Sequence, residues 1–274
     1  MNMRTNPFPR TGALLAAIGA TLILVSVGAN GWAGDSAPRK HEAWSWSGAL
    51  ASGRALEING INGPITAERS ESGRVEVTAD KSGRRDDPSG VKIEVTQDSN
   101  GITICAVYPG QNSACRPLEA AARHRNDSDV QVDFHVKVPA GVSFTANTVN
   151  GRVSALGLAG PVHAHTVNGA CDIATSVSGD ATTVNGSVSA VLGRVSASER
   201  LRFNTVNGSI TLTLPDDLDA EVEGSTVNGG IRSDFPVTVN GGWGPQSLHG
   251  TLGHGGASLS ASTVNGSIRL ARSN

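Results

Sequence analysis

Apolar and polar residues alternate along much of this chain with a period of two, which is the pattern of a half-buried β-strand. The clearest stretch runs from Val130 to Val138, where Val or Phe occupies every second position and Gln, Asp, His or Lys stands between. Similar but shorter stretches cover residues 75–79, 91–96 and 102–107, between clusters of Gly, Ser, Asp and Pro. These patterns predict an all-β fold.

The tetrapeptide Thr-Val-Asn-Gly recurs seven times in the second half of the chain. Its asparagines are separated by 18, 17, 22, 21, 12 and 25 residues, and an apolar residue usually follows the glycine by two positions. Most of these steps match one coil of a β-solenoid. The seven pairs are Asn150 and Gly151, Asn168 and Gly169, Asn185 and Gly186, Asn207 and Gly208, Asn228 and Gly229, Asn240 and Gly241, and Asn265 and Gly266.

Stacking explains why identical residues recur where similar ones would satisfy a hydrophobic pattern. Neighbouring coils lie about 4.8 Å apart, so one asparagine amide would donate to the asparagine carbonyl of the next coil. We expect the asparagines to form a buried structural turn ladder, and consecutive ones, such as Asn168 and Asn185, to lie within about two ladder spacings. We expect the glycines to have positive φ, which Gly adopts freely.

A meander of β-hairpins is the alternative architecture, because Asn-Gly between alternating apolar residues is also a strong signal for a type I′ turn. Residues 201–214 fit a hairpin register, with Leu201 opposite Leu214. The hairpin leaves unexplained why Thr-Val precedes nearly every Asn-Gly. The β-solenoid is therefore the preferred prediction, and both alternatives are all-β.

The pattern divides the chain into four parts. We expect a signal peptide over residues 1–33, a flexible linker over 34–49, a less regular N-terminal β module over 50–147 and the repeat solenoid over 148–274. The boundary between the last two is soft, since Asn59-Gly60 and Asn62-Gly63 resemble earlier coils. A short helical segment is expected at residues 118–125.

The first 33 residues predict export. Arg4 and Arg10 precede an uncharged, mostly apolar stretch, and Gly31-Trp32-Ala33 fits a small-x-Ala cleavage site. The alternative is an uncleaved anchor, because residues 12–29 approach the length that spans a bilayer. Contact with a membrane is expected only through this segment if it is retained. The predicted location is the periplasm or the cell surface.

Composition narrows the classes of partner. The chain has 34 glycines and only 17% charged residues, which disfavours long helices. Its net charge of −2 would become −4 on loss of residues 1–33, which hold two arginines and no acid. A basic stripe that could neutralise phosphates is absent, so nucleic acid is not an expected partner.

Three cysteines in an oxidising compartment suggest a disulfide. Cys105 and Cys115 flank the turn-like Pro109-Gly110-Gln111-Asn112 at a short separation, and they are the candidate pair. Cys171 shares strand parity with Ile173, which indicates a small buried hydrophobe.

The run Phe134-His135-Val136-Lys137-Val138-Pro139-Ala140-Gly141, followed by Thr148-Val149-Asn150-Gly151 and its successors, resembles the bacterial putative-adhesin family of unknown function. The resemblance covers most of residues 54–270. It implies an exported or membrane-anchored β-repeat protein, and for some members a part in envelope stress sensing. It implies no catalytic or ligand-binding residue.

Candidate chemistry is sparse, and no catalytic residue, metal site or cofactor is predicted. The chain has no Gly-x-Ser-x-Gly elbow, phosphate-binding loop or Cys-x-x-Cys pair. His163 and His165 share a strand face, but two ligands alone make a weak metal site. Residues 126–129 are rich in oxygen ligands that calcium prefers, although a turn before the Val130 strand explains them more simply.

Two functions fit these observations. The first is a non-catalytic envelope protein that binds or scaffolds a protein or a glycan on a flat solenoid face. The alternative is a polysaccharide-processing β-helix enzyme, which would need acids or bases gathered on adjacent coils. Charges such as Asp172, Asp180 and Arg194 are scattered in the sequence, which favours the first function.

Overall fold

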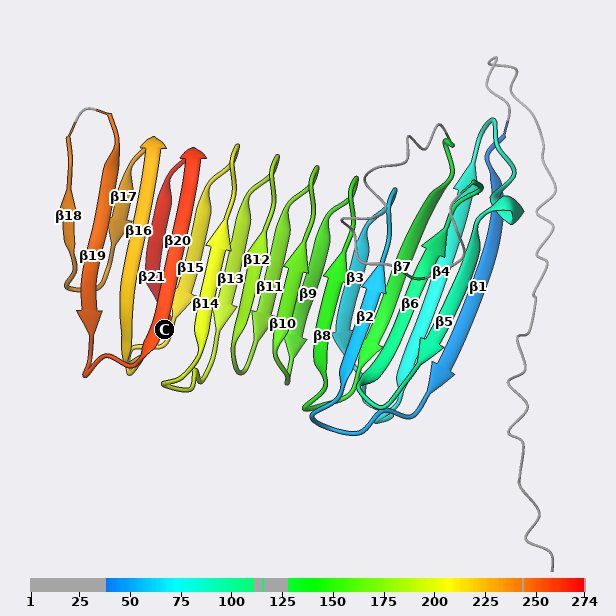
Figure 1. The fold of residues 1–274 in the computed structure, drawn as a ribbon, viewed down its shortest axis with the longest axis horizontal. Coiled ribbons are helices and arrows are strands. Elements are labelled where there is room, and N and C mark those ends of the chain that lie inside the picture. Colours follow the sequence, from blue (N-terminus) through cyan, green and yellow to red (C-terminus); the bar gives the residue numbers. More distant parts are fainter. Residues whose placement is uncertain (1–37, 111–114, 116–127, 243, 274) are drawn as a thin grey trace, which may run out of the picture.

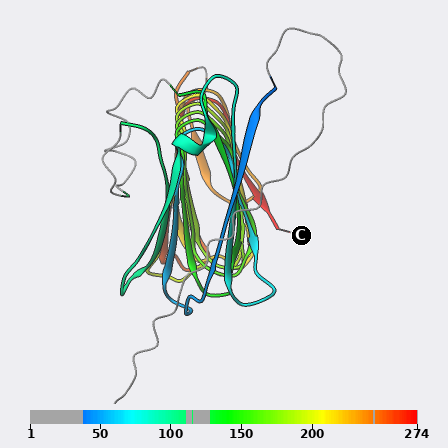
Figure 2. The same ribbon diagram turned by 90° about the vertical axis from the view of Figure 1, so that its right-hand side faces the viewer.

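The computed structural model describes residues 38–110, 115, 128–242 and 244–273, so the expected signal peptide and the 118–125 segment lie outside it. The described residues form strands β1 to β21 and one 3-10 turn, η1 (Pro88–Gly90). The strands make two sheets that face each other along an elongated body (Figures 1 and 2). The predicted all-β solenoid is confirmed.

Within the described residues, one sheet has ten strands in the order β1-β4-β7-β3-β9-β11-β13-β15-β21-β17. Their bounds are β1 Lys40–Gly48, β3 Ile65–Arg69, β4 Val75–Gly83, β7 Gln131–Val138, β9 Val153–Leu158, β11 Cys171–Thr175, β13 Val188–Leu192, β15 Ile210–Leu214, β17 Ile231–Ser233 and β21 Ile268–Arg272.

The facing sheet has eleven strands among the described residues, in the order β18-β19-β16-β20-β14-β12-β10-β8-β2-β6-β5. Their bounds are β2 Ala55–Asn59, β5 Lys92–Gln97, β6 Gly101–Val107, β8 Ser143–Asn147, β10 Val162–His165, β12 Gly179–Thr182, β14 Arg200–Asn204, β16 Ala220–Asn228, β18 Thr238–Asn240, β19 Gln246–Leu252 and β20 Ala257–Asn265.

Each central coil contributes one strand to each sheet and turns at its Asn-Gly corner. Strands β8, β10, β12 and β14 pair in parallel in one sheet, and β9, β11, β13 and β15 do so in the other. β14 and β15, which the hairpin alternative would pair, belong to different sheets. The repeats are therefore stacked coils.

The spatial order of the coils departs from the chain order at both ends. The coil of β20 and β21 is last in sequence, but it lies between β14/β15 and β16/β17. At the other end, the coil of β2 and β3 lies between β6/β7 and β8/β9. Antiparallel strands then extend the sheets, β4 and β1 at one end and β19 and β18 at the other (Figure 1).

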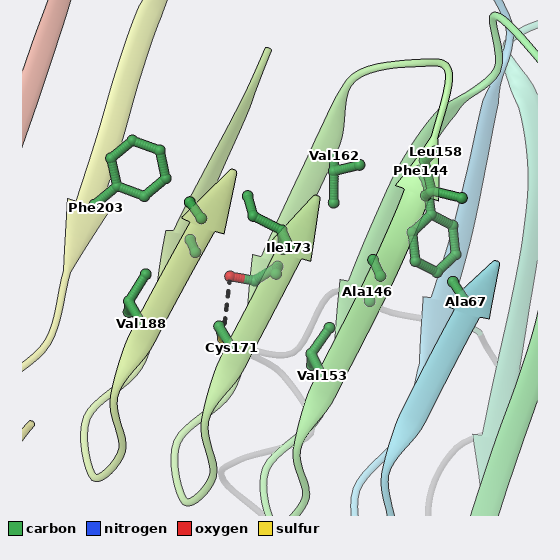
Figure 3. Close-up of a cluster of buried hydrophobic side chains, with 14 of the residues drawn as sticks. Ala67, Phe144, Ala146, Val153, Leu158, Val162, Cys171, Ile173, Val188 and Phe203 are labelled. Carbon is green, nitrogen blue, oxygen red and sulfur yellow. Dashed lines mark hydrogen bonds between the residues drawn. The ribbon is translucent and has the colours of Figure 1, made fainter. Parts of the chain in front are cut away.

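The core lies between the two sheets, where alternate residues of the strands point inward and are mostly apolar. Phe144, Val153 and Ile173 are at most 1% exposed, and Figure 3 shows such side chains stacked from coil to coil. Cys171 is fully buried here, and its thiol donates to the carbonyl oxygen of Ala164 (3.7 Å). Burial raises the pKa of the Cys171 thiol to about 12, so this cysteine remains a protonated core residue.

The structure differs from the expected division into parts. Residues 40–48, which were expected to lie in a flexible linker, form strand β1, because Trp44 and Trp46 pack against the core. The two sheets also continue across the 147/148 boundary, since β8 pairs with β2 on one side and β10 on the other. None of the helical structure in the described residues is long and apolar enough to cross a membrane.

Candidate functional site

Six of the seven motif asparagines, together with Asn62, form a ladder along one corner of the solenoid. The Nδ2 of each motif asparagine in the ladder donates to the Oδ1 of an asparagine in the neighbouring coil at 2.8 Å, and the Nδ2 of Asn62 at the end donates to the carbonyl oxygen of Ser128 (3.5 Å). In spatial order the ladder consists of Asn62, Asn150, Asn168, Asn185, Asn207, Asn265 and Asn228. The ladder begins one coil earlier than the seven motifs, at Asn62, because Ile61-Asn62-Gly63 forms the same corner with Ile in place of Val.

The motif threonines and glycines hold the coils together beneath the asparagines. Thr183 is buried, and its Oγ1 donates to the carbonyl oxygen of Gly169 in the preceding coil (2.8 Å). A Cβ built on Gly186 would overlap that same carbonyl group. The equivalent bonds and close approaches recur in every coil from Gly151 to Gly266.

Three expectations about the motif were wrong. The ladder asparagines with the Thr-Val-Asn-Gly sequence are exposed, because their side chains stack outside the corner while threonine points inward. Among the motif glycines only Gly241 has a positive φ. At the other motif glycines, the residue is glycine because the neighbouring coil leaves no room for a Cβ. Asn240 is outside the ladder: it lies in β18, opposite Ser247 of the antiparallel β19. Consecutive motifs also need not be neighbours, because Asn265 separates Asn207 from Asn228.

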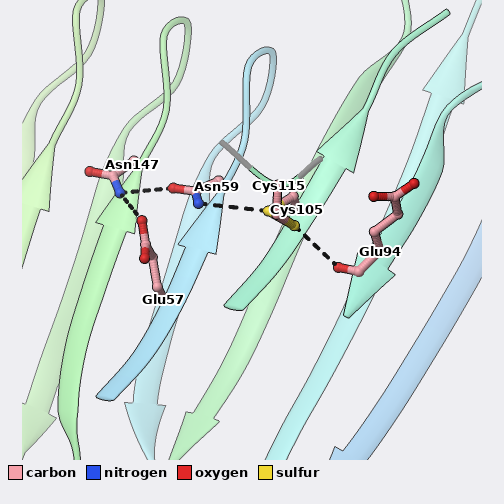
Figure 4. The surroundings of a disulfide bond; sticks show 6 residues. All are labelled: Glu57, Asn59, Glu94, Cys105, Cys115 and Asn147. Carbon is pink, nitrogen blue, oxygen red and sulfur yellow. Dashed lines mark hydrogen bonds between the residues drawn. A yellow bond between two sulfur atoms is a disulfide. The ribbon is translucent and has the colours of Figure 1, made fainter. Parts of the chain in front are cut away.

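Cys105 and Cys115 form a disulfide, with their Cα atoms 5.6 Å apart. A polar row leads to it across the outside of the eleven-stranded sheet (Figure 4). Asn147 donates to the Oδ1 of Asn59 (2.8 Å) and to Glu57 (3.1 Å), and Asn59 donates to the sulfur of Cys105 (3.7 Å). The disulfide therefore anchors residue 115 to the surface of this sheet.

The outer side of the eleven-stranded sheet between β10 and β19 carries mostly polar side chains, and we call these polar side chains the polar face. Val227 of β16 and Val264 of β20 are also exposed on this side, at the corner end of their strands. All members of the polar face are exposed or half-exposed. They are His163 and His165 of β10, Asp180 and Thr182 of β12, Arg200, Arg202 and Asn204 of β14, Ser258, Ser260 and Ser262 of β20, Glu221, Glu223 and Ser225 of β16, and Ser247, His249 and Thr251 of β19.

A cleft of about 220 Å³ lies at one end of the polar face, around His163 and Asp180. His163 Nδ1 forms a hydrogen bond with Asp180 Oδ1, and His165 Nε2 lies 3.8 Å from Asp180 Oδ2. Glu199, on the turn before β14, also lines the cleft, and its Oε2 is buried without a hydrogen-bond partner among the described residues. Arg200 adds a positive charge to the cleft wall.

The two histidines respond oppositely to this environment. The hydrogen bond to Asp180 raises the pKa of His163 above its ordinary value, with a further contribution from the charge of Glu199. Burial lowers the pKa of His165, and the nearby His163 adds to that effect. Between these two pKa values His163 is protonated and His165 is neutral.

A second cleft, of about 300 Å³, lies between β20, β16 and β19. Ser260, Ser225 and Ser247 supply small hydroxyl side chains, and Glu223 and His249 stand beside them. The serine row of β20 thus runs between a strand that carries arginines, β14, and one that carries glutamates, β16. Such a groove offers hydrogen-bond donors and acceptors together with both signs of charge.

The polar face provides no assembled metal site. Among the described residues, no three His, Cys, Asp or Glu side chains are grouped so that they could hold a metal ion. Asp129, from the segment considered for calcium, instead accepts backbone hydrogen bonds from Arg85, Asp86 and Arg84 at 3.0–3.3 Å. These bonds lower the pKa of Asp129 to about 2, and the carboxylate holds the turn after β4 in place.

The contact between His163 and Asp180 was missed from the sequence, although a signal for it exists. Both residues stand five positions before a motif asparagine, and the 17-residue step from Asn168 to Asn185 places them on neighbouring coils. The same offset gives the row Glu57, Thr145, His163, Asp180, Arg202, Ser260 and Glu223. Aligning the coils on their asparagines therefore identifies side chains that meet.

Comparison with known proteins agrees with this architecture. The family model Toastrack DUF4097 matches residues 118–271, more than half of the chain. The chain belongs to the Toastrack DUF4097 family. The resemblance to adhesin-like β-repeat proteins of unknown function is thereby confirmed. No curated protein matches this Toastrack chain.

Solved structures resemble the Toastrack chain at low sequence identity. A putative cell adhesion protein from Clostridium sporogenes is 11% identical, with 86% of this chain and 100% of that chain covered and a TM-score of 0.46. A putative adhesin from Bacteroides fragilis is 10% identical, with 84% and 97% covered and a TM-score of 0.34. A putative lipid binding protein from Parabacteroides distasonis is 12% identical, with 85% and 96% covered and a TM-score of 0.28.

Proposed function

We propose that this protein is an exported, non-catalytic module of the cell envelope that binds a glycan or a protein on its polar face. The observation that carries the proposal is the serine row Ser258, Ser260 and Ser262, flanked by the arginines of β14 and the glutamates of β16. Hydroxyl groups suit the many donors and acceptors of a saccharide or an extended peptide. Arginine and carboxylate groups at the edges add charge-assisted hydrogen bonds, which are stronger and directional.

A rigid frame supports a binding role. The corner ladders fix the spacing of the coils, so the side chains of the polar face are presented in a constant arrangement before any ligand arrives. Preorganisation of this kind reduces the entropic cost of binding. The ladders continue from Asn62 to Asn228 without interruption, which makes the face a single long surface.

Export and the lack of catalysis are parts of the same proposal. The Cys105–Cys115 disulfide supports export, because disulfides persist mainly in oxidising compartments. The apolar stretch before residue 33 and its small-x-Ala site support cleavage on export. Against catalysis, the second cleft is lined by a single carboxylate, Glu223, whereas glycosidases use two, and in the first cleft Asp180 is hydrogen-bonded to His163.

The experiment is a glycan array of bacterial cell-wall fragments and surface polysaccharides, read both for binding and, by mass spectrometry, for turnover. Ser260→Trp would fill the serine row, and we expect at least a tenfold loss of affinity for any glycan retained by the wild type. Ser189→Trp is the matched control, because Ser189 lies on the outer side of the opposite sheet. Equal loss in both variants, or consumption of a glycan, would refute the proposal. N-terminal sequencing of the protein from the envelope fraction tests cleavage near residue 33.

A further inference from the structure

The two ends of the solenoid expose sheet edges of very different length. At the N-terminal end, which faces the viewer in Figure 2, the edge strands are β1 with nine residues and β5 with six. At the other end, β17 and β18 have three residues each. Within the described residues no strand pairs with the outer side of β1. A long free edge is a template for another strand, and short edges are not.

Apolar side chains at the N-terminal end are incompletely covered. Trp44 and Trp46 of β1 face the interior and pack against the core, but both remain half-buried. Ile93 of β5 is also only partly buried, and Val95 beside it is 36% exposed. At the C-terminal end, Phe235 is 7% exposed and Val239 of β18 is 39% exposed. The N-terminal end therefore leaves two tryptophans and two aliphatic side chains of the core partly exposed.

The charges of β1 do not protect this edge, because groups of the same chain already engage them. Edge strands commonly use charged residues to prevent pairing. Here each of the first three residues of β1 lies beside an ionisable side chain of its own chain. The contacts join Lys40 to Asp87 (3.8 Å), His41 to Asp80 (3.5 Å) and Glu42 to Lys81 (3.1 Å).

We propose that β1 pairs with β1 of a second copy of this chain, antiparallel, about a two-fold axis at Trp44. The sequence of β1 is self-complementary in this register, since its charged residues lie in the first third and its last third is uncharged. The facing pairs are Lys40 with Gly48, His41 with Ser47, Glu42 with Trp46, Ala43 with Ser45, and Trp44 with Trp44. No like charges face each other, and the two Trp44 rings meet at the axis, where aromatic pairs are favourable.

The same symmetry determines how the two sheets of each copy are placed. An antiparallel pair has its two-fold axis perpendicular to the sheet, so the interior side of β1 in one copy continues the interior side in the other. The β5 edges of the facing sheet are then directed toward each other but do not meet, because β1 extends its sheet one strand beyond β5. Both polar faces lie on the same side of the dimer.

The test is the oligomeric state of the full chain as recovered from its producing cell, measured by sedimentation velocity over a range of concentrations. The wild type forms a dimer. Trp44→Lys and Trp44→Glu each weaken the dimer at least tenfold, because like charges meet at the axis. An equimolar mixture of the two variants restores the dimer, which a variant that had merely lost its fold would not do. Val239→Lys, at the centre of β18, is the control and leaves the dimer intact.

The register has its own readout. Ala43→Cys mixed with Ser45→Cys gives a disulfide-linked dimer under mild oxidation, because these positions face each other in the proposed pair. The proposal is overturned if the wild type is monomeric at every concentration, if Val239→Lys dissociates the dimer while Trp44→Lys does not, if the mixed charge variants stay apart, or if the mixed cysteine variants do not cross-link.

Discussion

The close approach of the coils at their glycines predicts that Gly186→Ala strongly destabilises the solenoid. A Cβ at position 186 would overlap the carbonyl group of Gly169, and backbone atoms of a stacked coil cannot rotate away as a side chain can. Gly186 does not have a positive φ, so alanine brings no backbone strain and the overlap alone determines the effect. Thr183 donates to the same carbonyl at 2.8 Å, so separating the coils also weakens that hydrogen bond.

Overpacking of this kind costs about 1–3 kcal/mol. For a domain of this size, 1 kcal/mol lowers the melting temperature by roughly 2–4 °C. Gly230→Ala is the matched control, because a Cβ there meets nothing within 4 Å and its φ is not positive. Its stability should stay within about 0.5 kcal/mol of the wild type. Urea unfolding of both variants measures the difference, and equal midpoints would refute the view that stacking selects glycine.

Three further predictions concern the ladder, the first cleft and the disulfide. Asn185→Asp removes one donor from the exposed ladder and should cost about 0.5–1.5 kcal/mol in urea unfolding, whereas Asn240→Asp, outside the ladder, should have almost no effect; equal losses would contradict the ladder. His163 should titrate above 6.5 in NMR because its pKa is raised by Asp180, so the stability it contributes is complete below about pH 6.5 and is lost as the pH rises through its folded pKa. Asp180→Asn should remove this pH dependence, and an unchanged titration would refute the assignment. Cys115→Ser opens a loop with a sequence separation of 10 and should lower the free energy of unfolding by about 2–3 kcal/mol. A variant that melts like the wild type would contradict this prediction.

The repeated tetrapeptide allowed the sequence to predict the coil stack, because identical residues in register are what a ladder requires. The conformation of the motif was predicted less well. Asn-Gly suggested a positive φ by analogy with hairpin turns, whereas Gly169 is needed only because the neighbouring carbonyl leaves no room for a side chain. Asn240 follows Asn228 by 12 residues, which is shorter than the other steps, and the chain between them forms no further coil of this kind.

The order of the coils could not be read from the sequence. Asn207 accepts a hydrogen bond from Asn265, but the same bond could be made by any coil with this corner, including that of Asn228. Interchangeable corners carry no information about which neighbour is chosen. The closing antiparallel strands decide the order instead, since β19 pairs with β16 and leaves the β20 coil to fill the position between β16 and β14.

Part of the first cleft was predictable by the same alignment, and part was not. His163 and Asp180 share an offset from their motif asparagines, so the coil register brings them together. Glu199 has no such partner, because it lies on a turn before β14 in the long 22-residue step between Asn185 and Asn207. The position of a side chain on a turn depends on local backbone geometry, which periodicity does not specify.

The contrast between the corner and the polar face indicates which residues are free to bind a ligand. At the corner, Thr, Asn and Gly are nearly invariant from coil to coil, because each must match its counterpart in the neighbouring coil. Five positions earlier, the corresponding residues on the outside of the sheet include Thr145, His163, Asp180, Arg202 and Ser260, which differ in size and in charge. Stacking of the backbone places no demand on these outward side chains, so their identities are free to serve a ligand. A uniform frame that carries a varied row of polar groups is the arrangement expected when the corners provide rigidity and the face provides recognition.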